Sequence, residues 1–228
     1  MSDSAVYAEV QKREEIIMSD NDCRTTLIAV ATPLFAEKGF HGVSVRELAK
    51  AANMNLSMIS YYFGGKESLY TAVLSEQFAT LKQVAEIGKL TLDPLGKFEC
   101  YISATVERYR KNPYLLRFYT SELTNPTSSF ELIVKPAIRE VLLILQGIFN
   151  EGLASGQFRK KLDPMDTILA LAGMINFYFL LEPVTQEFVD RAPERDEILV
   201  KHLMDIFTRG VLSMNNGQLT MDNGKTKV

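Results

Sequence analysis

Apolar side chains recur at helical spacing along most of this 228-residue sequence. Glycine and proline punctuate these stretches, and no convincing alternating pattern of a β-strand appears among them. The sequence therefore predicts an all-α fold, and a hydrophobic share of 46% is enough to bury a core. The longer helices are expected near residues 66–88, 95–111, 114–124, 129–153, 164–182 and 194–213.

Three shorter helical segments with clear start and stop signals come before the longer ones. The first ends where Gly39 can adopt a left-handed cap. Ser44 followed by Glu47 is the capping-box pattern, so the second helix begins at Ser44. Asn53 ends that helix, because asparagine tolerates the left-handed conformation of a tight turn. Asn55 is then a suitable N-cap for the third helix.

The third segment places Leu56, Ile59 and Phe63 on one stripe, and Gly64 with Gly65 stops it. Two helices of about eight residues joined by a turn of about three form a helix-turn-helix, whose second member can lie in the DNA major groove. Short helix pairs with a tight turn are common, so this spacing alone does not decide the function.

Composition narrows the possible settings. The formal net charge is −3, which gives no global indication of nucleic acid binding. Residues 22–70, however, hold five basic against four acidic side chains and are the only net-positive part. Sparse cysteine, the absence of a visible signal peptide and a longest apolar stretch of 15 residues favour a cytoplasmic protein that does not cross a membrane.

Catalysis is not expected. The two histidines, His41 and His202, lie far apart in sequence, and no metal-ligand spacing or nucleophile motif is present. A phosphate-binding loop would need glycine at Ser60 and Ser or Thr at Glu67, so Gly64-Gly65-Lys66 is better explained as a helix stop. We therefore expect no catalytic residues, no metal and no cofactor.

Residues 34–70 contain four further features in order. They are a Phe-Ala-Glu-Lys-Gly-Phe helix end, a Ser-Val-Arg-Glu-Leu-Ala second helix, a closing Tyr-Tyr-Phe and a Gly-Lys-Glu-x-Leu start to the next helix. In these features the chain closely resembles the DNA-binding domain of the TetR family of bacterial repressors. Asn53 stands where the family usually has glycine and Ser60 where many members have an aromatic residue; both departures bear on which DNA sequence is read.

The resemblance implies an N-terminal three-helix helix-turn-helix domain followed by a larger helical domain for ligand binding and dimerisation. The expected division is a flexible arm at 1–21, the DNA-binding domain at 22–70, the effector-binding and dimerisation domain at 71–214 and a flexible tail at 215–228.

Nine residues are the expected DNA contacts: Ser44, Arg46, Asn55, Ser57, Met58, Ser60, Tyr61, Tyr62 and Lys66. Arg46 and Lys66 each combine a cation with a helix N-terminus, which favours phosphate. The surface of the third helix offers serines and Met58 to base edges but no Arg or Gln for bidentate pairing, so DNA shape should contribute to specificity. The competing interpretation is that the cations are solvated surface charges and that Tyr61, Tyr62 and Met58 pack against the core.

Helix 164–182 is apolar nearly all round, and helix 194–213 offers a companion surface at Ile198, His202, Leu203, Ile206 and Gly210. This pair resembles the helices through which TetR-like proteins form a dimer. A homodimer would place two recognition helices on a palindromic operator. The alternative is that both helices are buried within one subunit.

Aromatic residues between the two ends are numerous enough to line a cavity, although such residues are ordinarily core. The resemblance implies an inducer site there, for which we expect Tyr101, Arg117, Phe118, Glu122, Phe149, Asn176 and Tyr178. The interior favours a small apolar or aromatic effector, which would release the repressor from DNA. The alternatives are a helical dimeric adaptor that binds protein, and a TetR-like regulator without a ligand.

Overall fold

The computed structural model describes the backbone of residues 3–189 and 194–212 and, within these ranges, the side chains from residue 22 onward. Helices make up its regular structure, and in the described ranges the β-pairing is one isolated bridge between Phe158 and Leu212. The all-α prediction is confirmed. The predicted tail at 215–228 lies outside the described residues.

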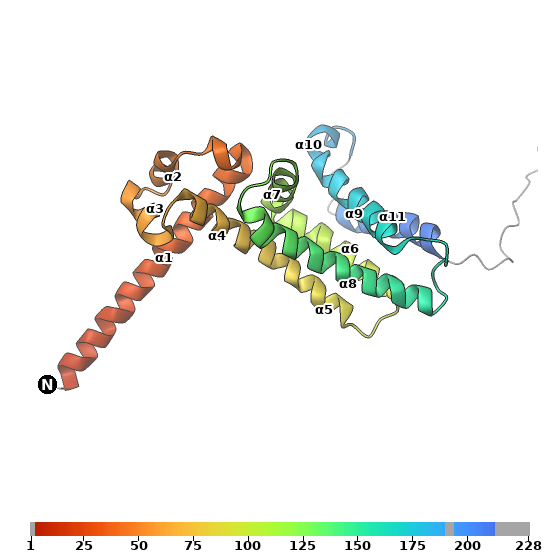
Figure 1. Cartoon of the computed structure of the whole chain (residues 1–228), viewed down its shortest axis with the longest axis horizontal. Coiled ribbons are helices and arrows are strands. Elements are labelled where there is room, and N and C mark those ends of the chain that lie inside the picture. The colour runs from red at the N-terminus through yellow and green to blue at the C-terminus, as the bar shows by residue number, and fades with distance from the viewer. Residues whose placement is uncertain (1–2, 190–193, 213–228) are drawn as a thin grey trace, which may run out of the picture. The chain divides into compact units, whose positions relative to one another are not determined.

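The described elements follow one another along the chain from α1 to α11 (Figure 1). They are α1 (Asp3–Gly42), α2 (Val45–Ala51), α3 (Leu56–Phe63), α4 (Lys66–Ala79), the 3₁₀ turn η1 (Thr80–Lys82), α5 (Gln83–Gly88), α6 (Pro94–Lys111), α7 (Pro113–Thr124), the π-turn η2 (Phe130–Val134), α8 (Lys135–Ala154), α9 (Pro164–Leu180), α10 (Glu182–Thr185) and α11 (Arg195–Val211).

These elements form two compact units. The first unit comprises the chain up to residue 81 together with 112–138, and the second comprises 82–111 together with the chain from 139 onward. The expected boundary between 70 and 71 lies within α4, and the predicted division into domains stays a prediction. Within the first unit α4 is linked to the later segment by hydrogen bonds: Tyr70 Oη donates to Glu122 Oε1 of α7 at 2.7 Å, and the Thr71 and Ser129 hydroxyls are 2.7 Å apart.

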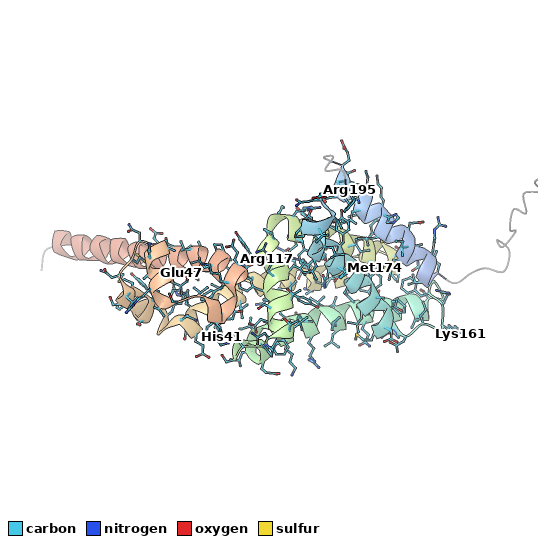
Figure 2. All side chains as sticks on the ribbon, turned by 90° about the horizontal axis from the view of Figure 1, so that it is seen from above. His41, Glu47, Arg117, Lys161, Met174 and Arg195 are labelled. Atoms are coloured by element: carbon cyan, nitrogen blue, oxygen red, sulfur yellow. The ribbon has the colours of Figure 1, made fainter. Side chains whose placement is uncertain are left out.

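The first unit packs α1, α2, α3 and α4 around a shared apolar core. Leu27, Ala31 and Phe35 form the buried stripe of α1, at the four-residue spacing of one helix face. The Phe35 ring meets the Tyr70 ring edge-on at 4.9 Å between centroids. A Lys38–Glu47 ion pair joins α1 to α2 on the surface. The hydrogen bond that Lys38 Nζ donates to Glu47 within this pair raises the pKa of Lys38 and lowers that of Glu47. Figure 2 labels Glu47.

The start and end of α1 differ from the expected outline. Its helical backbone continues back to Asp3 through the segment expected to be a flexible arm, whose flexibility stays a prediction. Gly39 takes a positive φ of 70° as predicted, but its ψ of 170° lies outside the left-handed helical region. The chain therefore kinks at Gly39 and forms one more turn before Gly42.

The second unit is built around phenylalanines contributed by separate helices. The Phe98 ring of α6 lies 4.7 Å from the Phe207 ring of α11, and the Phe149 ring of α8 lies 4.9 Å from that of Phe158. Gly152 allows this packing, because a Cβ there would fall 2.3 Å from Phe158 Cδ2. α6 and α11 thus share one core.

Two prolines lie in the first turn of a helix. Pro136 occupies the first turn of α8, which begins at Lys135 directly after the π-helix η2, so its missing N–H costs no hydrogen bond within α8. Asp163 caps α9 by accepting a hydrogen bond from Asp166 N at 2.9 Å, with Pro164 in the first turn.

Candidate nucleic-acid interface

The start of α2 holds Ser44 and Arg46 at an exposed helix N-terminus. Ser44 Oγ accepts a hydrogen bond from Glu47 N at 3.2 Å, which confirms one half of the capping box. The Glu47 carboxylate accepts from Lys38 instead of returning to the cap. Arg46 lies exposed on the first turn of α2. A cation and free N–H groups at one helix end suit an approaching phosphate.

The turn between α2 and α3 forms as its asparagines predict. Asn53 has a φ of 51°, the left-handed conformation expected of it. Asn55 occupies the N-cap position of α3, but its side chain makes no capping hydrogen bond. Because Asn55 is also exposed, its amide is directed at solvent rather than committed to the helix.

α3 buries one face and exposes a polar one. Ile59 and Phe63 are buried, whereas Ser57 and Ser60 are exposed and the Tyr61 side chain is 72% exposed. Hydroxyl groups on this face can hydrogen-bond to base edges or phosphates. The polar face expected of a recognition helix is therefore present.

Two residues of α3 differ from the simple two-faced pattern. Leu56, predicted to lie on the buried stripe, is 49% exposed, because it is the first residue of the helix and has no neighbouring turn to cover it. Met58 is half-buried, so both interpretations of it remain open. Tyr62 is also half-buried, with its ring edge-on to Tyr61 at 5.0 Å.

The turn after α3 depends on glycine. Gly64 has a φ of 77° and donates its N–H to Ser60 O at 2.9 Å, and Gly65 has a φ of 143°. Lys66 then begins α4, but its ammonium is already engaged: Nζ donates to Val43 O at 2.7 Å and lies 4.3 Å from the centroid of the Phe40 ring. Lys66 thus links the start of α4 to the segment just before α2. Because an ammonium has three N–H donors, donors remain for a phosphate.

Arg24 is a cation near α3 that was not among the expected contacts. Its guanidinium carbon lies 4.7 Å from the centroid of the Phe63 ring, at the end of α3, and the residue is exposed. The only indication in the sequence is that Arg24 belongs to the net-positive segment, because its neighbour in space is 39 positions away.

The outward face of α9 and α11 in the second unit is apolar. Ile168, Leu171, Ile175 and Phe179 are the buried stripe of α9. Other large apolar residues of the two helices are exposed: Leu169, Phe177, Leu180, Ile198 and Ile206. Tyr178 lies at the border of the buried stripe and is half-buried.

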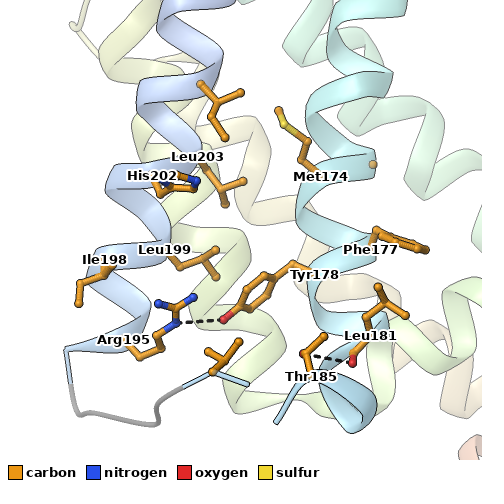
Figure 3. A pocket seen from close by; sticks show the side chains of 13 residues that line it. Met174, Phe177, Tyr178, Leu181, Thr185, Arg195, Ile198, Leu199, His202 and Leu203 are labelled. Carbon is orange, nitrogen blue, oxygen red and sulfur yellow. Dashed lines mark hydrogen bonds between the residues drawn. The ribbon is translucent and has the colours of Figure 1, made fainter. Parts of the chain in front are cut away.

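A groove of about 1010 Å³ runs along this face between α9 and α11. Met174 and Tyr178 point from α9 toward α11, and Leu199 and Leu203 point back from α11 (Figure 3). Arg195 Nε donates to Tyr178 Oη at 3.3 Å across one end. Exposed apolar area of this kind marks a surface that binds another molecule.

Two family models match the sequence. One, described as bacterial regulatory proteins of the tetR family, covers residues 27–73; the other, described as a tetracyclin repressor-like C-terminal domain, covers residues 94–208, half of the chain. The chain belongs to the TetR family of bacterial regulators. It is accordingly a DNA-binding transcriptional regulator and not an enzyme.

The names of similar proteins agree with this assignment. The chain is 32% identical over 129 residues to YttP, a probable HTH-type transcriptional regulator of Bacillus subtilis, a match that covers 55% of this chain and 62% of YttP. It is 26% identical over 160 residues to the HTH-type transcriptional repressor NicS of Pseudomonas putida, covering 68% of this chain and 74% of NicS. The ketosteroid transcriptional regulator KstR2 of Mycobacterium tuberculosis shares the fold, with a TM-score of 0.66 at 19% identity over 84% of this chain and 95% of KstR2.

The residues expected to bind an effector in this TetR-family regulator are divided between the two units. Tyr101, Phe149, Asn176 and Tyr178 belong to the second unit, and Arg117, Phe118 and Glu122 to the first. Arg117 is exposed, whereas Phe118 and Phe149 are buried core. Asn176 accepts a hydrogen bond from Tyr109 Oη at 2.7 Å. Their joint role in one site stays a prediction.

Glu122 has a structural role that the sequence does not reveal. It is fully buried and accepts from Tyr70 Oη at 2.7 Å, from Thr127 N at 3.2 Å and from Thr127 Oγ1 at 3.1 Å. Burial, and next the Glu122 carboxylate, raise the pKa of Tyr70. Glu122 therefore links α4 to α7 and has donors around it already.

The described residues lack two other features. No group of three or more His, Cys, Asp or Glu residues there could hold a metal ion. None of the described helices is both long and apolar enough to span a bilayer.

Proposed function

We propose that this protein is a homodimeric repressor that binds a palindromic operator and is released from it by a small, largely apolar or aromatic effector in the bacterial cytoplasm. The observation that carries the proposal is the exposed polar face of α3, which follows a tight turn in a helix-turn-helix. NicS, a relative named as a repressor, supports the direction of regulation.

The DNA contacts divide into anchors and readers. Arg46 and Lys66 would bind phosphates, with Ser44, Tyr61 and Tyr62 adding hydroxyl donors. Asn55, Ser57, Met58 and Ser60 would face base edges, where a serine accepts several pairings and Met58 suits a thymine methyl group. Because no arginine or glutamine lies on this face of α3, much of the discrimination would come from DNA shape.

The dimer would form through α9 and α11. Their exposed face carries isoleucine, leucine and phenylalanine side chains, whose contact with water is unfavourable. A second copy of the same face can cover them. Two-fold symmetry then sets the recognition helices roughly 34–36 Å apart, one helical turn of DNA. A palindromic operator follows from this symmetry.

Induction would act through coupling between sites. An effector that binds better to a conformation with wrongly spaced recognition helices lowers DNA affinity, and DNA lowers effector affinity by the same factor. A TetR-like regulator without a ligand is the remaining alternative, whereas membership of the family removes the support for a protein-binding adaptor.

The test is fluorescence anisotropy of the purified protein against labelled DNA from its own upstream region, titrated with salt. A dimer with about 6–10 phosphate contacts should lose on the order of 10³–10⁵ in affinity between about 50 and 200 mM salt. Arg46→Ala should lower the slope of log affinity against log salt by about 2, one phosphate in each subunit.

Arg139→Ala is the matched control, because Arg139 is an exposed arginine of the second unit. It should bind as the unchanged protein does. If neither upstream DNA nor a selection from random duplexes yields salt-dependent, sequence-selective binding, the proposed operator binding through α3 is wrong.

A further inference from the structure

α6 carries four cations, and three of them have a carboxylate partner. Lys97 Nζ lies 2.7 Å from Glu151 Oε2, Arg110 Nε lies 2.9 Å from Asp196 Oδ1, and Lys111 pairs with Glu107. Arg108 differs from all three. It is only 8% exposed, and its Nε and Nη2 have no hydrogen-bond partner in the part of the chain that the structure describes.

The comparison with Lys97 is the closest one. Lys97 is buried to a similar degree, at 6% exposed, and is three helical turns before Arg108 on the same face of α6. Lys97 has Glu151 to balance its charge. A buried cation without such a partner is strongly unfavourable, so a protein ordinarily supplies one.

Arg108 cannot escape this cost by losing its proton. Burial lowers the pKa of its guanidinium, and the neighbouring Tyr101, Tyr109 and Glu107 side chains offset part of that effect. Guanidinium nevertheless stays charged at neutral pH. The buried positive charge is therefore permanent, and an anion is the group that would complete it.

We propose that Arg108 binds the carboxylate of a small monoanionic effector, an inference that rests on the effector-responsive repressor proposed above. Nε and Nη2 form one edge of the guanidinium, and their parallel N–H groups match the two oxygens of a single carboxylate. Since the other cations of α6 are paired, Arg108 offers one positive charge, which suits a carboxylate better than a doubly charged phosphate.

The rest of the effector should be apolar. Tyr101 lies two turns before Arg108 on the same face of α6 and is only 7% exposed, and its ring favours a hydrocarbon or an aromatic ring. Arg108 thereby adds a specific anchor to the apolar or aromatic effector of the proposed function.

The test is thermal unfolding of the full chain without DNA, in matched pairs of probes. Sodium acetate is compared with acetamide and sodium benzoate with benzamide, at equal ionic strength. Acetate carries the recognised group alone, and benzoate adds an apolar ring. At a concentration about tenfold above the dissociation constant, a carboxylate should raise the midpoint by roughly 2–4 °C more than its amide.

Variants assign the effect to Arg108. Arg108→Met should abolish the difference between carboxylate and amide, whereas the same change at exposed Arg139, Arg139→Met, should preserve it. Arg108→Lys keeps the charge without the paired donors and should respond less than the unchanged protein, which gives a readout even if the methionine variant does not fold.

Two results would overturn the inference: equal midpoints with each carboxylate and its amide in the unchanged protein, or a full carboxylate response in the Arg108 variants. Because the midpoint is measured without DNA, these results are separate from a failure of operator binding in the anisotropy experiment. A carboxylate response without operator binding would support the anion site and refute the proposed repressor.

Discussion

The two units differ in where their unmatched groups lie. In the first unit α1 to α4 share a buried apolar core, the buried Glu122 has three hydrogen bonds, and the outward face of α3 carries serine and tyrosine hydroxyls. In the second unit apolar residues of α9 and α11 are outside, and the buried Arg108 has two donors without a partner among the described residues.

This difference indicates what each unit requires from outside itself. In the first unit the buried carboxylate is hydrogen-bonded and the polar face of α3 is stable in water. DNA is the only partner that this unit is proposed to bind. An exposed apolar face and an unpaired buried charge are both unfavourable in an isolated protomer. We infer that the first unit is complete within one subunit, whereas the second becomes complete with a second copy and an anion.

The largest effect is expected from the α9–α11 face. Ile198→Glu combined with Ile206→Glu places two charges on a face where these residues are 50% and 44% exposed, so the protomer should stay folded while the dimer dissociates. Sedimentation velocity should report a monomer. Loss of two-site binding should weaken operator affinity by about 10²–10⁴-fold and halve the salt dependence.

Leu132→Glu provides the control for this change, because Leu132 is 73% exposed in η2 of the first unit. It should leave both the mass and the operator affinity unchanged. A double variant that still sediments as a dimer would show that the second unit associates through some other surface.

The second effect compares two of the buried charged side chains, Glu122 and Arg108. Glu122→Leu leaves the Tyr70 hydroxyl and the Thr127 donors without an acceptor, and should lower the free energy of unfolding by roughly 2–3 kcal/mol in a urea titration. Arg108→Met removes a charge that lacks a partner, and should leave the ligand-free protein as stable or more so.

Glu131→Leu, at an exposed position of η2, is the control for the carboxylate deletion and should have little effect. The contrast between the units would fail if Arg108→Met destabilised the ligand-free protein as much as Glu122→Leu does. Arg108 would then have a structural partner of its own.

The sequence predicts the local structure of the first unit well, because its signals act over a few residues. Ser44, Asn53 and Gly64 each have the cap or backbone conformation that their residue types favour. Asp163 does the same at the start of α9 in the second unit. In each case the residue acts on the backbone within four positions of itself, so the local sequence pattern is sufficient to predict the conformation.

Contacts between distant residues could not be predicted in this way. Glu47 pairs with Lys38 rather than closing the capping box, and Lys66 donates to Val43 O across the fold. Glu122 was a candidate for orienting a ligand, but Tyr70, 52 positions away, already occupies it. These partners depend on how helices pack, which periodicity does not specify.

Arg108 was missed for a different reason. It falls on the same helical stripe as Tyr101 and Thr105, both buried, so an arginine at an apolar position was visible in the sequence. An arginine there can snorkel to water or find an acid, and only the structure distinguishes these outcomes. The burial of its side chain and the two donors without partners made it a candidate.

A third, smaller effect tests whether the first unit has a further phosphate anchor. Arg24→Met removes the exposed cation beside Phe63 at the end of α3. If Arg24 binds phosphate in each subunit, the salt slope should fall by about 2 and operator affinity by about 10-fold at moderate salt. Unchanged salt dependence in the anisotropy titration would limit Arg24 to a packing role against Phe63.

The smallest effect concerns the pH dependence of the satisfied interior. Burial and the Glu122 carboxylate raise the pKa of Tyr70 above the value of about 10 that it has in the unfolded chain. Above that pH the unfolded state loses this proton while the folded state keeps it, so the stability is present below pH 10 and declines above it, by about 1.4 kcal/mol for each pH unit. Tyr70→Phe should cost about 1 kcal/mol at neutral pH, through the lost hydrogen bond to Glu122.

Between about pH 10 and 11, however, Tyr70→Phe should lose less stability than the unchanged protein, because phenylalanine has no proton to release. Urea titrations at several pH values measure both quantities, and lysines and arginines that titrate in this range contribute equally to the two proteins. Tyr61→Phe makes the same chemical change at a hydroxyl that is exposed on α3, and should keep the alkaline slope of the unchanged protein. Parallel slopes for the Tyr70 variant and the unchanged protein would mean that Tyr70 ionises as readily in the folded state as in the unfolded one. The hydrogen bond between Tyr70 of α4 and Glu122 of α7 would then break in alkali. The first unit, like the second, would hold a buried charge without a partner.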